Sequence, residues 1–401
     1  MAKHTMLSMA SGRRSSPEQG DSSGNGIFRN LLSVILFRTD WLQILPMMLL
    51  ITIGELFIYG TGQQIGGFYA ETFWKRHLIY IGIGIAVWLI FSILDYRWCG
   101  PFALTLYPLS IALLIYVLFW GEKYFGARSW IQFGSINFQP SEVAKFSLLV
   151  LTAWILSMKK VNINRLFWLV LLVILTMIPV TLTKMQPDLG TATAMLAPVL
   201  AIIFTARLKW RYILILSIIA AICMPVGYYF LKDYQKERIR VFLDPSRDPS
   251  NRGWSTLQAE MAVGSGGLTG KGFMKGTHNL LGFLPQKVSN SDFIFPVIAE
   301  ETGFLGATGV VLTFMILLFS ILRTALLAPD DFGKYMCVGI AILMFFHTYV
   351  NIAMCLRLCP VTGLPLPLVS YGGTFLVTTM AYLGIVHSVY GHREKKTLFD
   401  L

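Results

Sequence analysis

The chain has 401 residues, of which 55% are hydrophobic and only 13% are charged, and its net charge is +12. A soluble domain carries about 25% charged residues, so this composition excludes an ordinary soluble protein and predicts a polytopic membrane protein. The positive charge does not indicate a nucleic-acid partner, because basic residues in cytoplasmic loops of membrane proteins give the same excess. The five cysteines show no spacing typical of a disulfide framework.

The two ends of the chain read differently from the rest. Residues 1–39 are basic, rich in Ser and Gly and without apolar periodicity, which predicts a disordered cytoplasmic tail. No cleavable signal is recognisable there, so the first span is expected to be an uncleaved anchor. Residues 393–401 are expected to form a short cytoplasmic tail.

Between the tails, residues 40–392 are predicted to form an all-α membrane domain. Apolar runs of about 17 to 25 residues mark spanning helices, and the sequence contains about ten of them. The predicted spans lie at 41–59, 78–94, 102–120, 142–157, 166–183, 190–206, 212–231, 293–322, 336–356 and 374–390.

The orientation follows from basic residues in short connections, which favour the cytoplasmic side. If the number of spans is even and the N-terminus is cytoplasmic, the short basic connections all fall on one side. These residues are Arg13, Arg14, Arg29, Arg38, Lys159, Lys160, Arg165, Arg207, Lys209, Arg211, Arg393, Lys395 and Lys396. Both termini are therefore predicted to be cytoplasmic.

The opposite side receives the unusual segments. They are "GARSWIQFGSINFQPSEVAK", "KMQPDLGTA", the long loop 232–292 between spans seven and eight, and "LCPVTGLPLPLVSYGG". Connections as long as 232–292 are usually functional or disordered, and the apolar and glycine-rich stretches in this one favour partial order. The prolines of the last segment prevent a regular helix, and a broken backbone at membrane depth is tolerated only inside protein or beside a wet cavity.

Cations on this outer side are candidates for holding an anion. Glycines in "MAVGSGGLTGKGF" would let backbone amides approach a phosphate, although the Walker A spacing is absent. The alternative is a solvated basic loop that touches lipid headgroups. The candidate ligands are Arg238, Arg240 and Lys271 in the loop and Arg357 beside the broken segment.

In "FQPSEVAK", Pro140 and Ser141 are typical of a helix start, with Ser141 a candidate cap. Glu142 and Lys145 are three residues apart and share a face of that helix. An ionisable pair entering a membrane must be paired or face a polar cavity. Two roles stay open for it, a structural ion pair and a substrate-binding pair.

Two acids stand at span boundaries. Asp188 is predicted to cap the helix that follows it. Asp292, in "NSDFIFPVIAEETGFLG", either caps the eighth span or carries chemistry. Histidines and carboxylates are too sparse on the outer side to indicate a protein metal site.

The segments "GARSWIQFGSINFQPSEVAK", "QPDLGTA", "GSGGLTGKG", "SDFIFPVIAEETGFLG" and "PVTGLPLPLVSYGG" occur here in the order found in the SEDS family. The chain thus resembles these peptidoglycan polymerases, which include RodA and FtsW, over roughly residues 40–392. One departure precedes Asp292: "LPQKVSNSDFIF" has Gln286 where an acid is usual.

The resemblance implies a glycosyltransferase that polymerises lipid II into glycan strands on the outer face of the cytoplasmic (inner) membrane. It implies a catalytic role for Asp292 and substrate-site roles for Glu142, Lys145 and Trp130. The α-linked donor and β-1,4 product imply inversion, and diphosphate is a leaving group that needs no protonating acid. A divalent cation, Mg²⁺ or Mn²⁺, is an open substitute for some of the loop cations.

The resemblance also implies a class B penicillin-binding protein as the transpeptidase partner, together with other proteins of the elongation complex. "QPDLGTA" and the short C-terminal tail favour the RodA role in elongation and cell shape; the FtsW role in division is the alternative. A lipid-linked precursor flippase would also suit broken helices. The grouping of ionisable residues toward one face disfavours that reading, and the ordered motifs disfavour an O-antigen ligase or polymerase.

Overall fold

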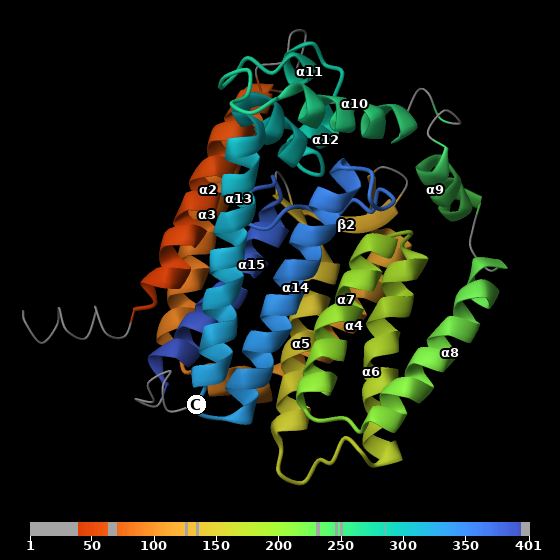
Figure 1. The fold of residues 1–401 in the computed structure, drawn as a ribbon. Helices are drawn as coiled ribbons and strands as arrows, with labels where there is room; N and C mark the ends of the chain where they lie inside the picture. The colour runs from red at the N-terminus through yellow and green to blue at the C-terminus, as the bar shows by residue number, and fades with distance from the viewer. Residues whose placement is uncertain are drawn as a thin grey trace, which may run out of the picture. The chain divides into compact units, whose positions relative to one another are not determined.

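A computed structural model of the chain describes residues 39–62, 70–124, 127–133, 136–229, 233–244, 248, 252–284 and 286–393. The predicted tails lie outside these residues, apart from Thr39 and Arg393. The described chain is mainly helical (Figure 1). Its long helices are α2 (Trp41–Thr61), α3 (Ala70–Ile93), α4 (Cys99–Trp120), α5 (Pro140–Ser157), α6 (Leu166–Met185), α7 (Leu189–Thr205), α8 (Trp210–Tyr229), α13 (Ile294–Leu327), α14 (Asp331–Cys355) and α15 (Gly373–Gly391).

Each predicted span coincides with one of these long helices. Within the described residues, seven helices are long and apolar enough to cross a membrane, and α7 is a shorter apolar helix. The chain is therefore a polytopic α-helical membrane protein, as its composition predicts. The number of ten crossings stays a prediction, because α5, α7 and α8 are not among the seven.

The outer helices carry large exposed apolar side chains, as contact with lipid requires. Leu45, Ile79, Phe167, Phe204 and Phe319 are each more than 60% exposed. Among the seven apolar helices, α14 and α15 are the most buried: 67% of the residues in the most apolar part of each are buried. These two helices therefore form the centre of the bundle.

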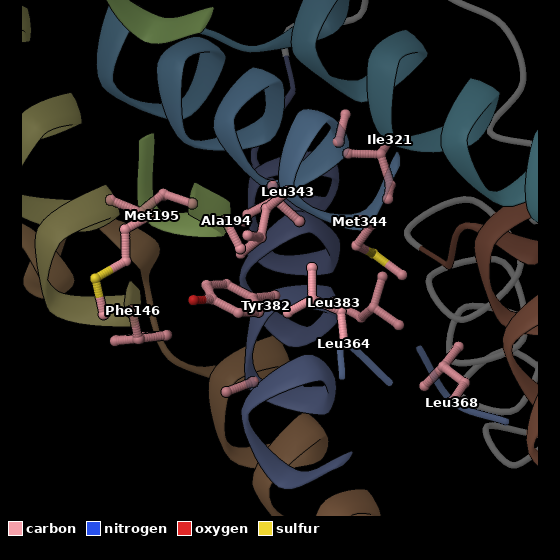
Figure 2. Packing of buried hydrophobic residues seen from close by; sticks show 14 of the residues in the cluster. Phe146, Ala194, Met195, Ile321, Leu343, Met344, Leu364, Leu368, Tyr382 and Leu383 are labelled. Atoms are coloured by element: carbon pink, nitrogen blue, oxygen red, sulfur yellow. The ribbon is translucent and has the colours of Figure 1, made fainter. Parts of the chain in front are cut away.

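Around α14 the core is continuous from helix to helix. Figure 2 shows Leu343 and Met344 of α14 among Met195 of α7, Ile321 of α13 and Leu383 of α15. All five side chains are at most 3% exposed. The position of α14 is therefore fixed by packing on several sides, which gives it little freedom to tilt or slide.

The short helices of the long loop gather at one end of the bundle (Figure 1). The long loop contains four short helices, so the expected partial order is present. They are α9 (Asp233–Leu243), α10 (Arg252–Ser265), α11 (Thr277–Leu280) and α12 (Gln286–Ser289).

A small antiparallel sheet at the same end was not predicted. It has the order β1–β2–β3, from Glu122–Tyr124, Ala127–Phe133 and Ile136–Phe138, with Glu122 opposite Trp130 and Ile131 opposite Phe138. The sequence predicts such a sheet poorly, because two of the strands have only three residues each, too few to show an alternation of apolar and polar residues. In addition, the η1 turn (Tyr96–Trp98) links α3 to α4.

The opposite end is tied together by one aspartate. The Asp40 carboxylate is 1% exposed and caps α2 by accepting the amide of Leu42 at 3.2 Å. It also accepts the Ser320 hydroxyl at 2.8 Å and pairs with Arg323 at 2.8 Å. The Arg323 guanidinium lies over the ring of Tyr390. The start of α2 and the end of α15 thus lie at the same end, as an even number of crossings requires.

The glycine-rich stretch of the long loop packs against a kink in α13. Gly303 has φ 68° in the middle of that helix, and a Cβ there would lie 2.3 Å from the amide nitrogen of Gly270. Backbone hydrogen bonds join the two segments, including Phe304 N to Gly267 O at 2.8 Å and Gly272 N to Glu301 O at 3.0 Å. These glycines therefore serve close packing of the loop on α13, in place of the expected cradle of amides around a phosphate.

Replacing Gly303 by Ala should destabilise the protein by at least roughly 1 to 3 kcal/mol, because the new Cβ combines a left-handed backbone with a steric clash. Thermal unfolding in detergent would measure the loss. Gly309→Ala on the same helix is the control, since a Cβ at Gly309 meets nothing within 4 Å. Equal melting temperatures for the two variants would contradict the packing role of Gly303.

Candidate functional site

The N-terminal ends of four helices meet near the small sheet. The Gln139 amide nitrogen, just before α5, donates to the Thr374 hydroxyl in the first turn of α15 at 3.2 Å. Its side-chain amide donates to Asp188, the residue before α7, at 3.4 Å. Asp292 stands two residues before α13. Because each helix N-terminus carries a partial positive charge, this end of the bundle suits an anion.

The broken segment between α14 and α15 links these helix starts. A Cβ at Gly190 in α7 would lie 2.7 Å from the carbonyl oxygen of Thr362, and one at Gly363 would lie 3.5 Å from Asp292 Oδ2. Further along, Ser370 donates its hydroxyl to the carbonyl of Ser291 at 2.6 Å. The segment thus runs between the starts of α7 and α13. Its second half, 364–370, is mostly buried, whereas Gly363 is exposed, so the irregular backbone passes from the surface of the bundle into protein.

Asp292 is not a helix cap. The N-cap position of α13 is Phe293, and no side chain caps that end. The Asp292 side chain is partly exposed. Burial and the neighbouring Asp188 carboxylate raise the pKa of Asp292 to about 6, against the lowering effects of the Ser291 hydroxyl and the Arg238 charge. A carboxylate with this pKa can accept a proton near neutral pH.

Asp188 does cap its helix, as expected. Its Oδ1 accepts the amide of Thr191 at 3.0 Å. Its second oxygen faces Gln139, and its negative charge acts on Asp292. The two acids at span boundaries therefore differ in role, one committed to a cap and the other free of capping bonds.

The backbone that carries Asp292 is held by α14. The Asn351 side-chain amide is completely buried and donates to two carbonyl oxygens, that of Asp292 at 3.0 Å and that of Leu364 at 2.8 Å. The Cys355 thiol lies 3.7 Å from the same Asp292 oxygen. One helix thus fixes both the acid and the broken segment.

Glu142 and Lys145 form a salt bridge of 2.8 Å inside the bundle, at 3% and 2% exposure. The Lys145 ammonium also lies 3.1 Å from Nε2 of His347, and Thr378 donates to Glu142 at 3.4 Å. Ser141 does not cap this helix: Gln139 occupies the N-cap position without a side-chain bond, and Pro140 begins the first turn.

Three of the four candidate cations are paired with glutamates. Arg240 pairs with Glu237 at 3.4 Å, Lys271 with Glu300 at 2.7 Å and Arg357 with Glu260 at 2.7 Å. Their charges are therefore partly neutralised within the loop. The charge of Arg238 on α9 lowers the pKa of Asp292.

Trp130 lies on β2 and is partly buried. The next residue back, Ser129, is 3% exposed and donates to the carbonyl of Gln186, two residues before Asp188. The strand thus borders the helix starts described above. No group of three or more His, Cys, Asp or Glu residues that could hold a metal ion occurs in the part of the chain that the structure describes.

Sequence reasoning left Gln139, His347 and Asn351 without a role. A signal for the last two was present, because a buried histidine or amide inside an apolar span is costly unless it has a partner. The partners themselves, on α5 and beside α13, could not be found from spacing along the chain.

Known proteins share this architecture over nearly the whole chain. A family model described as "Cell cycle protein", whose name joins FtsW, RodA and SpoVE, matches residues 40–395. The chain is 35% identical over 374 residues to the peptidoglycan glycosyltransferase MrdB of Escherichia coli K12, covering 89% of this chain and 96% of MrdB. It is 32% identical over 366 residues to a probable peptidoglycan glycosyltransferase FtsW of Geobacter sp. strain M18, covering 87% and 96%.

Solved structures are also similar, among them these two. One is a chain from a peptidoglycan synthase complex described as coordinating polymerization and crosslinking, with a TM-score of 0.75, 31% identity and coverage of 89% of this chain and 99% of that one. The other is the crystal structure of the rod shape determining protein RodA of Thermus thermophilus, with a TM-score of 0.66, 29% identity and coverage of 89% and 98%.

The pairing of Lys271 can be tested by stability alone. Lys271→Met should cost roughly 1 to 3 kcal/mol, because the wholly buried Glu300 loses a charged donor while Thr277 and His278 still donate to it. Adding Glu300→Gln should recover part of the loss by removing the buried charge. Thermal unfolding would measure both, with the exposed Lys275→Met as control. An unchanged melting temperature for Lys271→Met would contradict the structural role of the pair.

Proposed function

Since this chain belongs to the FtsW, RodA and SpoVE family of cell-cycle proteins, we propose that it is a peptidoglycan glycosyltransferase that polymerises lipid II. Two of its relatives carry that activity in their names. The proposal rests mainly on Asp292. Its carboxylate does not cap a helix, its pKa is raised, and it stands where several helix N-termini meet.

The reaction joins the 4-hydroxyl of one GlcNAc to C1 of the MurNAc of another molecule. Asp292 takes the proton of the acceptor hydroxyl as the new C1–O bond forms. The bond from C1 to the diphosphate oxygen breaks on the opposite side, so the configuration inverts and polyprenyl diphosphate leaves. One base suffices, because diphosphate departs without being protonated.

The leaving charge needs electrostatic support. The converging starts of α5, α7, α13 and α15 supply partial positive charge, and Arg238 is the loop cation we assign to the diphosphate. Arg240 and Arg357 would contribute after exchanging their exposed glutamate partners for the substrate. Lys271 would contribute from its partly exposed side while it keeps the buried Glu300 as its partner. Trp130 would border the bound sugar from the sheet.

The described residues do not fit a dedicated metal centre, since they contain no cluster of three suitable ligands. Mg²⁺ commonly binds through substrate phosphates with few protein ligands. A divalent cation that assists this enzyme would therefore enter with the diphosphate of lipid II.

We assign the enzyme to cell elongation, supported by its similarity to MrdB and to a rod shape determining RodA. Septal polymerisation of the FtsW kind is the alternative. The proposed setting is the cytoplasmic (inner) membrane with the site facing outward. The expected partner is a class B penicillin-binding protein, in keeping with a similar chain that belongs to a synthase complex coordinating polymerization and crosslinking.

Asp292→Asn should reduce glycan polymerisation at least about 100-fold, because the amide keeps the shape but cannot accept the proton. Labelled lipid II, supplied to the protein purified with its transpeptidase partner, would be followed by the length of the glycan products on a gel. Asp331→Asn is the matched control, the same change at an exposed position at the other end of the bundle. Long glycan from Asp292→Asn at the wild-type rate would refute the assignment. An inactive wild type with an intact fold would favour the precursor transporter.

The polymerisation rate should rise with pH through an acid limb near pH 6, since only the deprotonated Asp292 is a base and its pKa is raised to about 6. Asp188→Asn should move that limb to lower pH, because it removes the neighbouring negative charge while asparagine still caps α7. The measurement is the pH profile of the rate for wild type, Asp188→Asn and Asp331→Asn. A limb at the same pH in all three would show that Asp188 does not tune the base.

A further inference from the structure

Two polar side chains stand one turn apart in the second half of α14. His347 is 1% exposed and Asn351 is completely buried, and residues four apart in a helix share a face. Buried polar groups inside an apolar span are costly and are retained where they have a partner and a role. Each has partners on other elements, and the two sets of partners differ.

His347 completes the surroundings of the Lys145 ammonium. That group donates to Glu142 at 2.8 Å, lies 3.1 Å from Nε2 of His347 and lies 5.5 Å from the ring centre of Phe375. An ammonium can only donate, so Nε2 is the acceptor in this contact. With two hydrogen bonds and a ring around it at 2% exposure, Lys145 has no open side for a substrate phosphate.

The buried pair is therefore placed to hold helices together. Glu142 and Lys145 stand on α5, His347 on α14, and Phe375 and Thr378 on α15. Of the two roles that the sequence left open for the pair, this arrangement favours the structural one, because a buried ammonium with these partners would have to give one of them up to bind a ligand.

Asn351 makes the corresponding contacts one turn further along. Its two amide hydrogens are committed to the carbonyl oxygens of Asp292 and Leu364. Both oxygens belong to backbone outside regular helices, where ladder hydrogen bonds cannot hold them. Asn351 thus fixes the backbone of Asp292 through its carbonyl oxygen.

We propose that His347 and Asn351 are positioning residues, which couple the buried Glu142–Lys145 pair to the backbone carrying Asp292 through the rigid α14 helix. The proposal rests on the proposed function for its catalytic consequence. Neither residue touches substrate: a shift of α14 at His347 moves Asn351, and Asn351 moves the base. A misplacement of about 1 Å in a catalytic group can cost about 100-fold in rate.

A matched pair of variants isolates the His347 contact. The side-chain oxygen of glutamine reaches the position of Nε2, whereas that of asparagine stops near Nδ1. His347→Gln should keep the acceptor for Lys145 and polymerise within about threefold of wild type. His347→Asn should lower kcat at least about 10-fold with KM for lipid II nearly unchanged, because substrate contacts are intact. Both replacements bury a polar amide in the same place, so a difference in kcat between the two variants cannot come from the cost of burying a polar group.

Asn351→Asp removes the donors without changing the shape, and should lower kcat in the same way. The double variant His347→Asn/Asn351→Asp should be no slower than the slower single variant, because both changes act through one helix. Thr348→Val is the control: Thr348 is buried on the same helix, and its hydroxyl has no hydrogen-bond partner among the described residues.

A second readout does not depend on activity. Hydrogen–deuterium exchange of the peptide spanning 288–295 should speed up in His347→Asn and Asn351→Asp, and stay at the wild-type rate in His347→Gln and Thr348→Val. Unchanged exchange in His347→Asn, or a wild-type kcat in that variant, would overturn the coupling. Loss of polymerisation in the wild type itself would instead count against the proposed function, and the exchange result would still decide the coupling.

Discussion

A carboxylate beside hydrocarbon has to be held by the protein, because the bilayer core offers its backbone and side chain no water to bond. Around Asp292, buried side chains meet this requirement by donating hydrogen bonds to backbone carbonyl oxygens. Asn351 donates to the carbonyl oxygens of Asp292 and Leu364, and Ser370 donates to that of Ser291. The irregular backbone on both sides of the acid is thereby satisfied without using the carboxylate, which leaves the carboxylate available for proton transfer.

The same arrangement separates three electrostatic tasks. The Asp188 carboxylate caps α7, and its negative charge raises the pKa of Asp292. Helix N-termini provide positive potential without bringing a cation into direct contact with the base. The buried pair of Glu142 and Lys145 is neutral as a unit and ties α5 to α14. A base of raised pKa beside a site for departing negative charge is the combination that an inverting transfer to a sugar hydroxyl requires.

The long outer loop adds order where flexibility would be expected from its length. Its glycines let the backbone lie directly on the kink of α13 at Gly303, and Lys271 closes the contact by pairing with the buried Glu300. Because α13 begins beside Asp292, the loop also braces the start of the helix next to the acid. Arg240, Lys271 and Arg357 pair with glutamates, and the charge of Arg238 acts on Asp292.

The sequence by itself determined the membrane class and the positions of the long helices, because apolar runs of spanning length have no other stable use. It also identified Asp188 as a cap and Asp292 as the acid to question, although the same local pattern suggested a cap at Ser141 that the structure does not have. It did not indicate the sheet of 122–138, the contact of Lys145 with His347, or the hydrogen bond from Asn351 to the carbonyl oxygen of Asp292. The last two depend on contacts between residues 202 and 59 positions apart, and only helix packing brings such residues within hydrogen-bonding distance.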